Sequence, residues 1–242
     1  MTSDNELPTV MITIYGKPKQ KKTSDALAAF PTALFLGVPS AVTLVAQNEL
    51  GFTPSVHPDP PKNLVELVTL LRSLADTGKA LEYGAVVVDD LSHMCKRSML
   101  EWTDQAPTGR SGKKDRFFPY QQLNQYLLEI AHLSRHLGVH LAMTFHERMP
   151  GTNADGRFCP GGPDVPSRNQ VETLPSWCDV NIRAIQSAVS GRTDNPLHLR
   201  WACQDGIARG VLLQQAKRSL FDFQKTETKA ANSPTLPPPP SN

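Results

Sequence analysis

Short apolar runs alternate along this chain with longer stretches in which apolar residues recur at helical spacing. The strand candidates are residues 10–16, 33–36, 85–88, 140–145, 180–185 and 197–203. The helix candidates are residues 23–30, 62–77 and 120–137, with another beginning near Leu91. Uninterrupted apolar runs are typical of strands buried on both faces, and parallel strands need long connections of the kind found between these runs. The pattern therefore predicts an α/β fold with a mostly parallel central sheet.

Composition indicates the size and the class of the protein. The chain has 242 residues, of which 39% are hydrophobic and 20% are charged, which is enough for a domain with a core and excludes a wholly disordered chain. With 25 Lys and Arg against 23 Asp and Glu, the net charge of +2 does not by itself indicate a polyanionic partner. We expect one domain over residues 1–225 and a disordered tail over residues 226–242, which ends SPTLPPPPSN.

The sequence carries no signal for export or for membrane insertion. No run approaches the roughly 20 apolar residues that cross a bilayer, and the first residues lack a basic segment followed by an apolar one. The 4 cysteines are far apart and form no C-x-x-C pair, which favours reduced thiols over a disulfide or zinc framework. We therefore expect a soluble, cytoplasmic protein.

A phosphate-binding loop is indicated directly after the first expected strand. Residues 16–23 follow the pattern G-x-x-x-x-G-K-[ST] except at the second glycine, where Lys21 stands. In this pattern backbone N–H groups surround the phosphates, the lysine contacts the β- and γ-phosphates, and the hydroxyl binds Mg²⁺ at a helix N-terminus. Lys22 and Thr23 hold the last two positions. The predicted nucleotide-binding residues of this loop are Gly16, Lys17, Pro18, Lys19, Gln20, Lys21, Lys22, Thr23 and Ser24.

Because of Lys21, the sequence of this loop does not decide whether the loop binds phosphate. Glycine is favoured at that position because it adopts positive φ and lets the backbone approach the ligand closely. A lysine there either weakens binding or reshapes the loop, which makes the phosphate-loop (Walker A) motif degenerate. The alternative is a basic surface loop between a strand and a helix, and the octet alone does not choose between the two.

An acidic pair at the end of the third expected strand favours the nucleotide interpretation. Asp89 and Asp90 follow the apolar run 85–88 directly. We expect Asp89 to bind Mg²⁺ together with Thr23, because phosphate loops use a second acid from a neighbouring strand. Asp90 has two interpretations of equal weight: it polarises the attacking water, or it caps the helix beginning near Leu91.

Three segments of the chain carry a resemblance to a known group of proteins. They are YGKPKQKKTSDALAAFPTALFLG, AVVVDDLSHM and LAMTFHERMPGTNADGRFCPGGPDVP. This layout resembles the phage-encoded ATP-binding proteins with a RecA-like core, a group linked with single-strand annealing and recombination. The resemblance spans roughly residues 10–210. It implies a three-layer RecA-like P-loop NTPase fold, ATP and Mg²⁺ as ligands, and action on single-stranded DNA as a homo-oligomer beside other phage recombination or replication proteins.

The resemblance also implies roles for residues at the end of the fourth expected strand. Thr144 and His146 match positions where such proteins sense the γ-phosphate, and Glu147 follows them. Together with the residues already named, this makes Lys22, Asp90 and Glu147 the expected catalytic residues, with one of the two acids orienting water. The resulting expectation is an ATPase acting on single-stranded DNA. The alternatives are a hydrolysis-deficient DNA-binding or scaffolding module, and a motor ATPase for DNA packaging or protein remodelling.

The chain departs from the RecA-like pattern at two points. Lys21 replaces the second loop glycine, and the second strand ends at Gly37 where many RecA-like enzymes offer a glutamate that activates water. Both departures affect hydrolysis more than binding.

A basic loop at residues 109–116 is the candidate DNA contact. It is rich in Gly and Ser, and Phe117 and Tyr120 follow it, so it combines phosphate-binding charges with rings on which a base can stack. The alternative is a solvated loop before a helix whose aromatic residues belong to the core. The predicted nucleic-acid-binding residues are Arg110, Lys113, Lys114 and Arg116.

Three weaker patterns complete the list of candidates. His132, His136 and His140 stand four apart but lack a cysteine or carboxylate set, so we interpret them as surface histidines rather than a metal site. Residues 155–156, Asp-Gly, predict a hairpin turn. Arg209 is a candidate for an arginine finger that reaches a neighbouring subunit.

Overall fold

The computed structural model of the chain describes residues 9–18, 22–38, 54–152, 156, 158–159, 161–186 and 199–203. Its helices are α1 (Lys22–Ala29), α3 (Leu64–Thr77), α4 (Leu91–Gln105), α5 (Phe118–Ser134) and α6 (Arg168–Trp177), with a 3-10 helix η1 (Lys79–Glu82). The strands of the main sheet are β1 (Met11–Gly16), β2 (Leu34–Gly37), β3 (Ser55–Val56), β4 (Ala85–Asp89), β5 (His140–Arg148), β8 (Gly162–Pro163), β9 (Val180–Gln186) and β10 (Leu199–Cys203). Strands β6 (Gly151–Thr152) and β7 (Phe158–Cys159) form a separate hairpin.

The main sheet has the order β10-β9-β1-β5-β4-β2-β3, and β8 pairs with the C-terminal end of β5. Neighbours from β9 to β3 run parallel, whereas β10 is antiparallel to β9 and β8 is antiparallel to β5. The prediction of a mostly parallel sheet is therefore confirmed. Because β5 lies between β1 and β4, the strand that leads into the phosphate loop and the strand that ends in Asp89 are separated by one strand.

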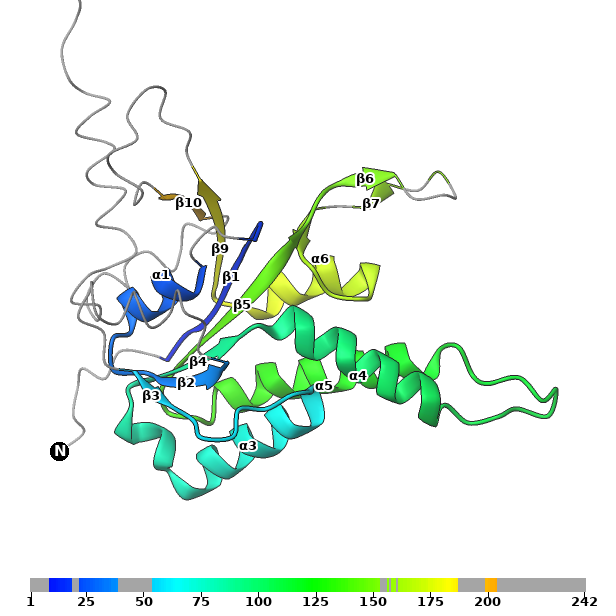
Figure 1. Ribbon diagram of the computed structural model, residues 1–242, viewed down its shortest axis with the longest axis horizontal. Helices are drawn as coiled ribbons and strands as arrows, with labels where there is room; N and C mark the ends of the chain where they lie inside the picture. The colour runs from blue at the N-terminus through cyan, green and yellow to red at the C-terminus, as the bar shows by residue number, and fades with distance from the viewer. Residues whose placement is uncertain are drawn as a thin grey trace, which may run out of the picture.

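Residues of each strand alternate between two apolar layers. On β1, Ile12 and Ile14 pack in the cluster that contains Leu27 of α1. Met11 and Tyr15 point to the opposite face and pack in the cluster formed with α3, α4, α5 and α6. Figure 1 shows the same arrangement, with α1 on one side of the sheet and α3, α4 and α5 on the other. Full burial of each large apolar side chain contributes about 1.5–3 kcal/mol, so both faces of the strands favour the three-layer arrangement.

Local signals explain where the helices begin and end. The α3 helix starts after Asn63, whose side chain accepts the N–H of Glu66 at 2.9 Å, while Glu66 accepts the N–H of Lys62 at 2.7 Å. It ends at Gly78, whose φ of 68° suits glycine and closes the helix. The predicted helices at residues 23–30, 62–77 and 120–137, and the one near Leu91, are all present within a few residues of their expected bounds.

The structure also adds elements that the hydrophobic pattern did not predict. These are β3, η1 and α6, of which α6 contains Pro175. The β5 strand runs on past its expected end at Phe145 because Glu147 and Arg148 pair with β8. β6 and β7 pair as a hairpin around the predicted turn at residues 155–156, of which Asp155 lies outside the described residues.

The remaining predictions concern parts of the chain that the structure does not describe. The tail at residues 226–242 and Arg209 lie outside the described residues. Within the described ranges, no helix combines the length and the apolar character needed to span a membrane. Cys95 and Cys178 are buried free thiols, and burial raises the pKa of both, so neither is an activated nucleophile.

Candidate nucleotide site

The phosphate loop leaves the carboxyl end of β1 and enters α1 at Lys22. Gly16 ends the strand, Lys17 and Pro18 are exposed, and Lys22 is the first residue of the helix. The ammonium of Lys22 donates to the carbonyl oxygen of Lys17 at 3.1 Å, and Lys22 is 8% exposed. The lysine therefore reaches back toward the loop that precedes it, as phosphate binding requires. Ser24 lies in the first turn of α1, while Lys19, Gln20 and Lys21 lie outside the described residues.

Asp89 lies within hydrogen-bond reach of two threonines from different elements. The hydroxyl of Thr144 on β5 donates to Oδ1 of Asp89 on β4. The side chain of Thr23, in the first turn of α1, also forms a hydrogen bond with Asp89. The two residues predicted to bind the metal, Thr23 and Asp89, are thus placed together, and the predicted sensor Thr144 joins them.

Burial changes the acid–base behaviour of the two charges at this edge. Burial raises the pKa of Asp89, the hydrogen bonds from Thr144 and Thr23 lower it, and the nearby Asp90 raises it again. Burial lowers the pKa of Lys22, although the carboxylates of Asp89, Asp90 and Glu147 oppose that effect. Burial therefore disfavours the charged form of both Asp89 and Lys22. Such perturbed groups are common at functional sites.

The donor set fits a nucleotide bound with Mg²⁺. A carboxylate and a hydroxyl oxygen, Asp89 and Thr23, are ligands that Mg²⁺ accepts when phosphate oxygens and water supply the rest. Lys22 and the N-terminus of α1 together favour the anionic phosphates. Among the described residues no group of three or more His, Cys, Asp or Glu is arranged to hold a metal by itself.

Asp90 has two polar partners. Its Oδ1 accepts the backbone N–H of His93 at 2.9 Å, so Asp90 is the N-cap of α4 and that interpretation is confirmed. Its Oδ2 lies 2.8 Å from Nε2 of His146. The backbone N–H of His146 donates in turn to the hydroxyl of Ser92 at 3.0 Å, which ties the end of β5 to the start of α4. The buried Nδ1 of His146 has no hydrogen-bond partner among the residues that the structure describes.

A cavity of about 360 Å³ opens beside the two acids. Gly37, Asp89 and Asp90 line one part of it, and His93 and Arg97 of α4 line another. Gly37 pairs with Asp89 across β2 and β4, and a Cβ atom on Gly37 would lie 2.5 Å from the carbonyl oxygen of Asp89. Only glycine fits there without moving β4, which explains why β2 carries no side chain at its end.

Glu147 is placed differently from the other predicted catalytic residues. Its Oε1 accepts from Nε of Arg183 at 2.7 Å and from a terminal guanidinium nitrogen of Arg183 at 2.5 Å. The side chain of Glu147 is 4% exposed, whereas that of Arg183 is 40% exposed. The carboxylate of Glu147 is therefore held in an ion pair with Arg183 of the same chain.

The basic loop lies away from these residues, at the far end of α4 and α5 (Figure 1). It forms a small hairpin in which Gly109 donates to the carbonyl of Lys113 at 2.9 Å. Lys114 donates to the carbonyl oxygens of Thr103 and Asp104 at 3.3 and 2.7 Å, at the C-terminal end of α4. The 15 residues of α4 separate this hairpin from Asp90, a distance of about 22 Å along the helix axis.

The hairpin exposes three of its predicted cations and two neighbouring aromatic rings. Arg110, Lys113 and Arg116 are exposed, and within the described ranges none of them forms an ion pair. Phe117 is 74% exposed and Tyr120 is 47% exposed, so both rings are accessible to a ligand.

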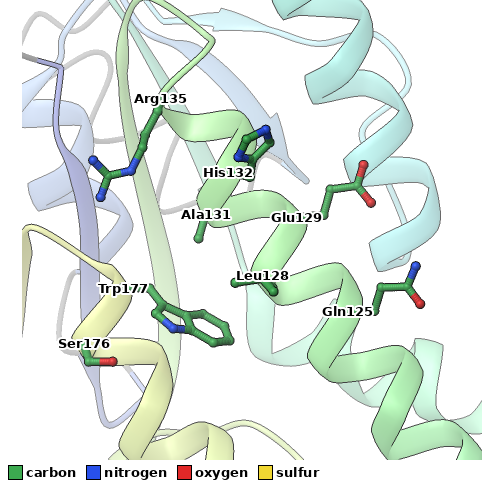
Figure 2. Close-up of a pocket in the computed structure, with 8 residues that line it drawn as sticks. All are labelled: Gln125, Leu128, Glu129, Ala131, His132, Arg135, Ser176 and Trp177. Carbon is green, nitrogen blue, oxygen red and sulfur yellow. The ribbon is translucent and has the colours of Figure 1, made fainter.

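A second cavity, between α5 and α6, contains none of the predicted site residues. It has a volume of about 640 Å³, and Figure 2 shows Trp177 and Leu128 facing each other across it, with Arg135 near one end. All of its lining residues belong to α5, to the C-cap of α5 or to α6, so no strand end contributes to it. Ligands of open parallel sheets bind at the carboxyl ends of the strands. We therefore place the nucleotide site at the loop edge of the sheet and not in this cavity.

Sequence reasoning missed several residues of the site. The strand order brings Arg183 beside Tyr15, which directly precedes Gly16, and no local pattern reveals this placement. The interpretation of His140 as a surface residue was wrong, because it is 9% exposed and its Nδ1 accepts the N–H of Val10 at 3.2 Å. His132 and His136 are exposed, as predicted.

Three comparisons relate the chain to known proteins. Residues 9–234 match the AAA domain family, a span that covers most of the chain. Among solved structures, a KaiC-like protein from the hyperthermophilic archaeon Pyrococcus horikoshii OT3 is similar, with 11% identity, 87% of this chain and 81% of that chain covered, and a TM-score of 0.45. A search of curated proteins finds no match. The family match and the strand order support the expected RecA-like P-loop fold.

Proposed function

The chain belongs to the AAA domain family of P-loop ATPases, and we propose from its site that it binds ATP with Mg²⁺ and hydrolyses it. The observation that supports this most directly is the meeting of three elements at one edge of the sheet. Thr23 of α1, which directly follows Lys22, and Thr144 of β5 both hydrogen-bond to Asp89 of β4. A buried acid, a hydroxyl and a lysine at a helix N-terminus form the set that a magnesium–triphosphate complex requires.

In this proposal each residue has a separate task. Lys22 and the loop amides neutralise charge on the β- and γ-phosphates, while Thr23 and Asp89 hold the metal. Mg²⁺, when bound, supplies positive charge to the phosphate oxygens. Asp90 or Glu147 orients a water molecule for in-line attack, which forms a bond from water oxygen to the γ-phosphorus and breaks the bond to the leaving oxygen of ADP. Thr144 and His146 respond to the γ-phosphate.

We further propose that this ATPase acts on single-stranded DNA, as a homo-oligomer in phage recombination or replication. The hairpin at residues 109–116 supports this proposal, since its exposed cations and the adjacent Phe117 suit a phosphate backbone and a stacked base. The resemblance to the single-strand annealing and recombination group named above implies the same kind of function.

Substitution of Lys22 tests the nucleotide proposal. We expect Lys22→Ala to weaken ATP binding and to reduce turnover by about 100-fold or more, because the variant loses the cation on the phosphates. Binding is measured by titration of a fluorescent ATP analogue, and turnover by single-turnover and steady-state assays with Mg²⁺. Lys79→Ala, which removes an exposed lysine from η1, is the matched control. Binding that Lys22→Ala leaves unchanged would refute the phosphate-loop assignment.

The polynucleotide proposal is tested by the same assay with added DNA. We expect single-stranded DNA to stimulate turnover more than double-stranded DNA does. Stimulation by duplex DNA alone would favour a packaging motor instead. ATP binding without any turnover would favour the hydrolysis-deficient module, in line with Lys21 in the loop.

A further inference from the structure

We propose that Glu147 and Arg183 form a clamp across the end of β1, and that Arg183 is a positioning residue for the phosphate loop. The inference rests on the proposed nucleotide site. It assigns Glu147 to holding the loop rather than to orienting water.

The strand register places the clamp at the base of the loop. β1 lies between β5 and β9, and Tyr15 of β1 is level with both Phe145 of β5 and Arg183 of β9. Glu147 lies just beyond the level of Gly16, which is paired with His146. The ion pair therefore joins the two strands that flank the last residues of β1, where the chain turns into the phosphate loop.

The pair is shielded from solvent on its acidic side. Two of the three guanidinium nitrogens of Arg183, Nε and one terminal nitrogen, contact the same oxygen of Glu147, at 2.7 and 2.5 Å. Within the described ranges this carboxylate is the least exposed acid in any ion pair, at 4%, whereas Glu129 in the pair with Arg72 is 27% exposed. Removing one member of a buried pair leaves the other charge without compensation. Removing one member of this pair should therefore disturb the local structure more than removing one member of an exposed ion pair.

Tyr15 and Lys22 connect the clamp to the loop. Tyr15 is 3% exposed and immediately precedes Gly16. Burial raises the pKa of its phenol, while the charge of Arg183 lowers it and that of Glu147 raises it, so the ring lies close to both. The charge of Glu147 also acts on Lys22. Loss of Glu147 or Arg183 would thus alter the packing at the end of β1 and the electrostatic field at Lys22.

This placement separates the two candidate acids. Glu147 has its carboxylate engaged and shielded, whereas Asp90 lines the cavity beside Asp89 and has a side chain that is 22% exposed. A residue that orients water must reach solvent or substrate. Arg183 is likewise paired within its own chain, through its contacts with Glu147.

The test compares binding with turnover. We expect Arg183→Ala to raise the Kd for the fluorescent ATP analogue about ten-fold, and to change kcat at saturating ATP by less than about three-fold. Glu147→Gln should act in the same direction. Arg183→Lys should recover part of the affinity, since it keeps the charge but cannot present two nitrogens to the carboxylate. Arg72→Ala, which breaks the exposed pair with Glu129, is the matched control and should change neither quantity.

Two results of this binding and turnover comparison would overturn the clamp. If Arg183→Ala and Glu147→Gln lowered kcat by about 100-fold at saturating ATP with an unchanged Kd, Glu147 would be the catalytic acid. If the variants lost thermal stability with Kd and kcat both unchanged, the pair would be structural only.

A readout without nucleotide separates failure of the clamp from failure of the ATP site. Exchange of the amide hydrogens of residues 15–17 should be faster in Arg183→Ala, and in the milder Arg183→Lys, than in the wild type. If the wild type bound no ATP but these amides still exchanged faster in the variants, the nucleotide site would be wrong and the clamp would stand. Unchanged exchange would refute the clamp whatever the wild type binds.

Discussion

The loop edge of the sheet and the hairpin at residues 109–116 use charged side chains in opposite ways. At the loop edge, Lys22 is 8% exposed and Asp89 accepts hydrogen bonds from two threonines. At the hairpin, Arg110 and Lys113 are exposed, and within the described ranges neither forms an ion pair. The interaction of a buried charge with a ligand depends on the position of each atom and is weakly screened. The interactions of several exposed charges with a ligand add together and are screened by salt. The first region suits one small ligand, and the second suits a long polyanion.

The largest expected effect comes from a neutral substitution at the buried acid. Asp89→Asn removes the carboxylate that we propose as a ligand of Mg²⁺ while keeping the size of the side chain, so turnover should fall by about 100-fold or more. The measurement is steady-state ATPase activity over a range of Mg²⁺ concentrations. Asp76→Asn, on the exposed side of α3, serves as the control. Full activity of Asp89→Asn at ordinary Mg²⁺ concentrations would remove Asp89 from the metal site.

A smaller effect is expected when the exposed cations are removed together. The triple variant Arg110→Ser, Lys113→Ser and Arg116→Ser should weaken binding of single-stranded DNA by about ten-fold or more at moderate salt. The slope of log affinity against log salt should also fall by about 0.7 for each phosphate that the variant no longer neutralises. Fluorescence anisotropy of a labelled oligonucleotide measures both quantities. ATPase activity without DNA should stay unchanged.

Lys114 offers an internal control for that experiment. Its ammonium is bound to the carbonyl oxygens of Thr103 and Asp104, so it contributes to the end of α4 rather than to a free surface. Lys114→Ala should therefore weaken DNA binding less than the loss of Arg110 or Lys113. Equal losses for all these residues would mean that the hairpin acts only through its total charge.

The smallest expected effect is a dependence of stability on pH. Because burial raises the pKa of Asp89 above its unfolded value of 3.8, the folded protein holds the proton at pH values where the unfolded chain has lost it. Stability should then fall as the pH rises from 3.8 through the folded pKa. Without nucleotide, Asp89→Asn should lack this fall and be more stable than the wild type at neutral pH. Thermal melts between about pH 4 and 8 test this, and parallel curves for the two proteins would contradict it.

The features that sequence predicted best are those set by neighbouring residues. The run that ends in Asp89 shows its strand and its acid in one stretch, and Gly16 to Thr23 shows a strand, a loop and a helix start. Asp90 precedes a helix directly, and its capping role follows from that position. Features of this kind can be predicted because the local preference of the residues agrees with the structure that they adopt in the fold.

The features that sequence did not predict depend on which strands become neighbours. Glu147 meets Arg183 only because β1 lies between β5 and β9, an order that hydrophobic periodicity does not contain. His140 looks polar in the sequence, yet the fold buries it and the N–H of Val10 satisfies its ring. Thr144 was placed by family resemblance, and its hydrogen bond to Asp89 requires β5 to lie beside β4.

Gly37 limits how this site can be redesigned. Many RecA-like enzymes offer a glutamate at the end of the second strand, and the direct way to graft one here would be to replace Gly37. Because any side chain at that position meets the backbone of Asp89 at 2.5 Å, the graft would displace the acid that it is meant to assist. Val38, which is 77% exposed and comes next in the chain, is the position from which an added carboxylate leaves the sheet intact.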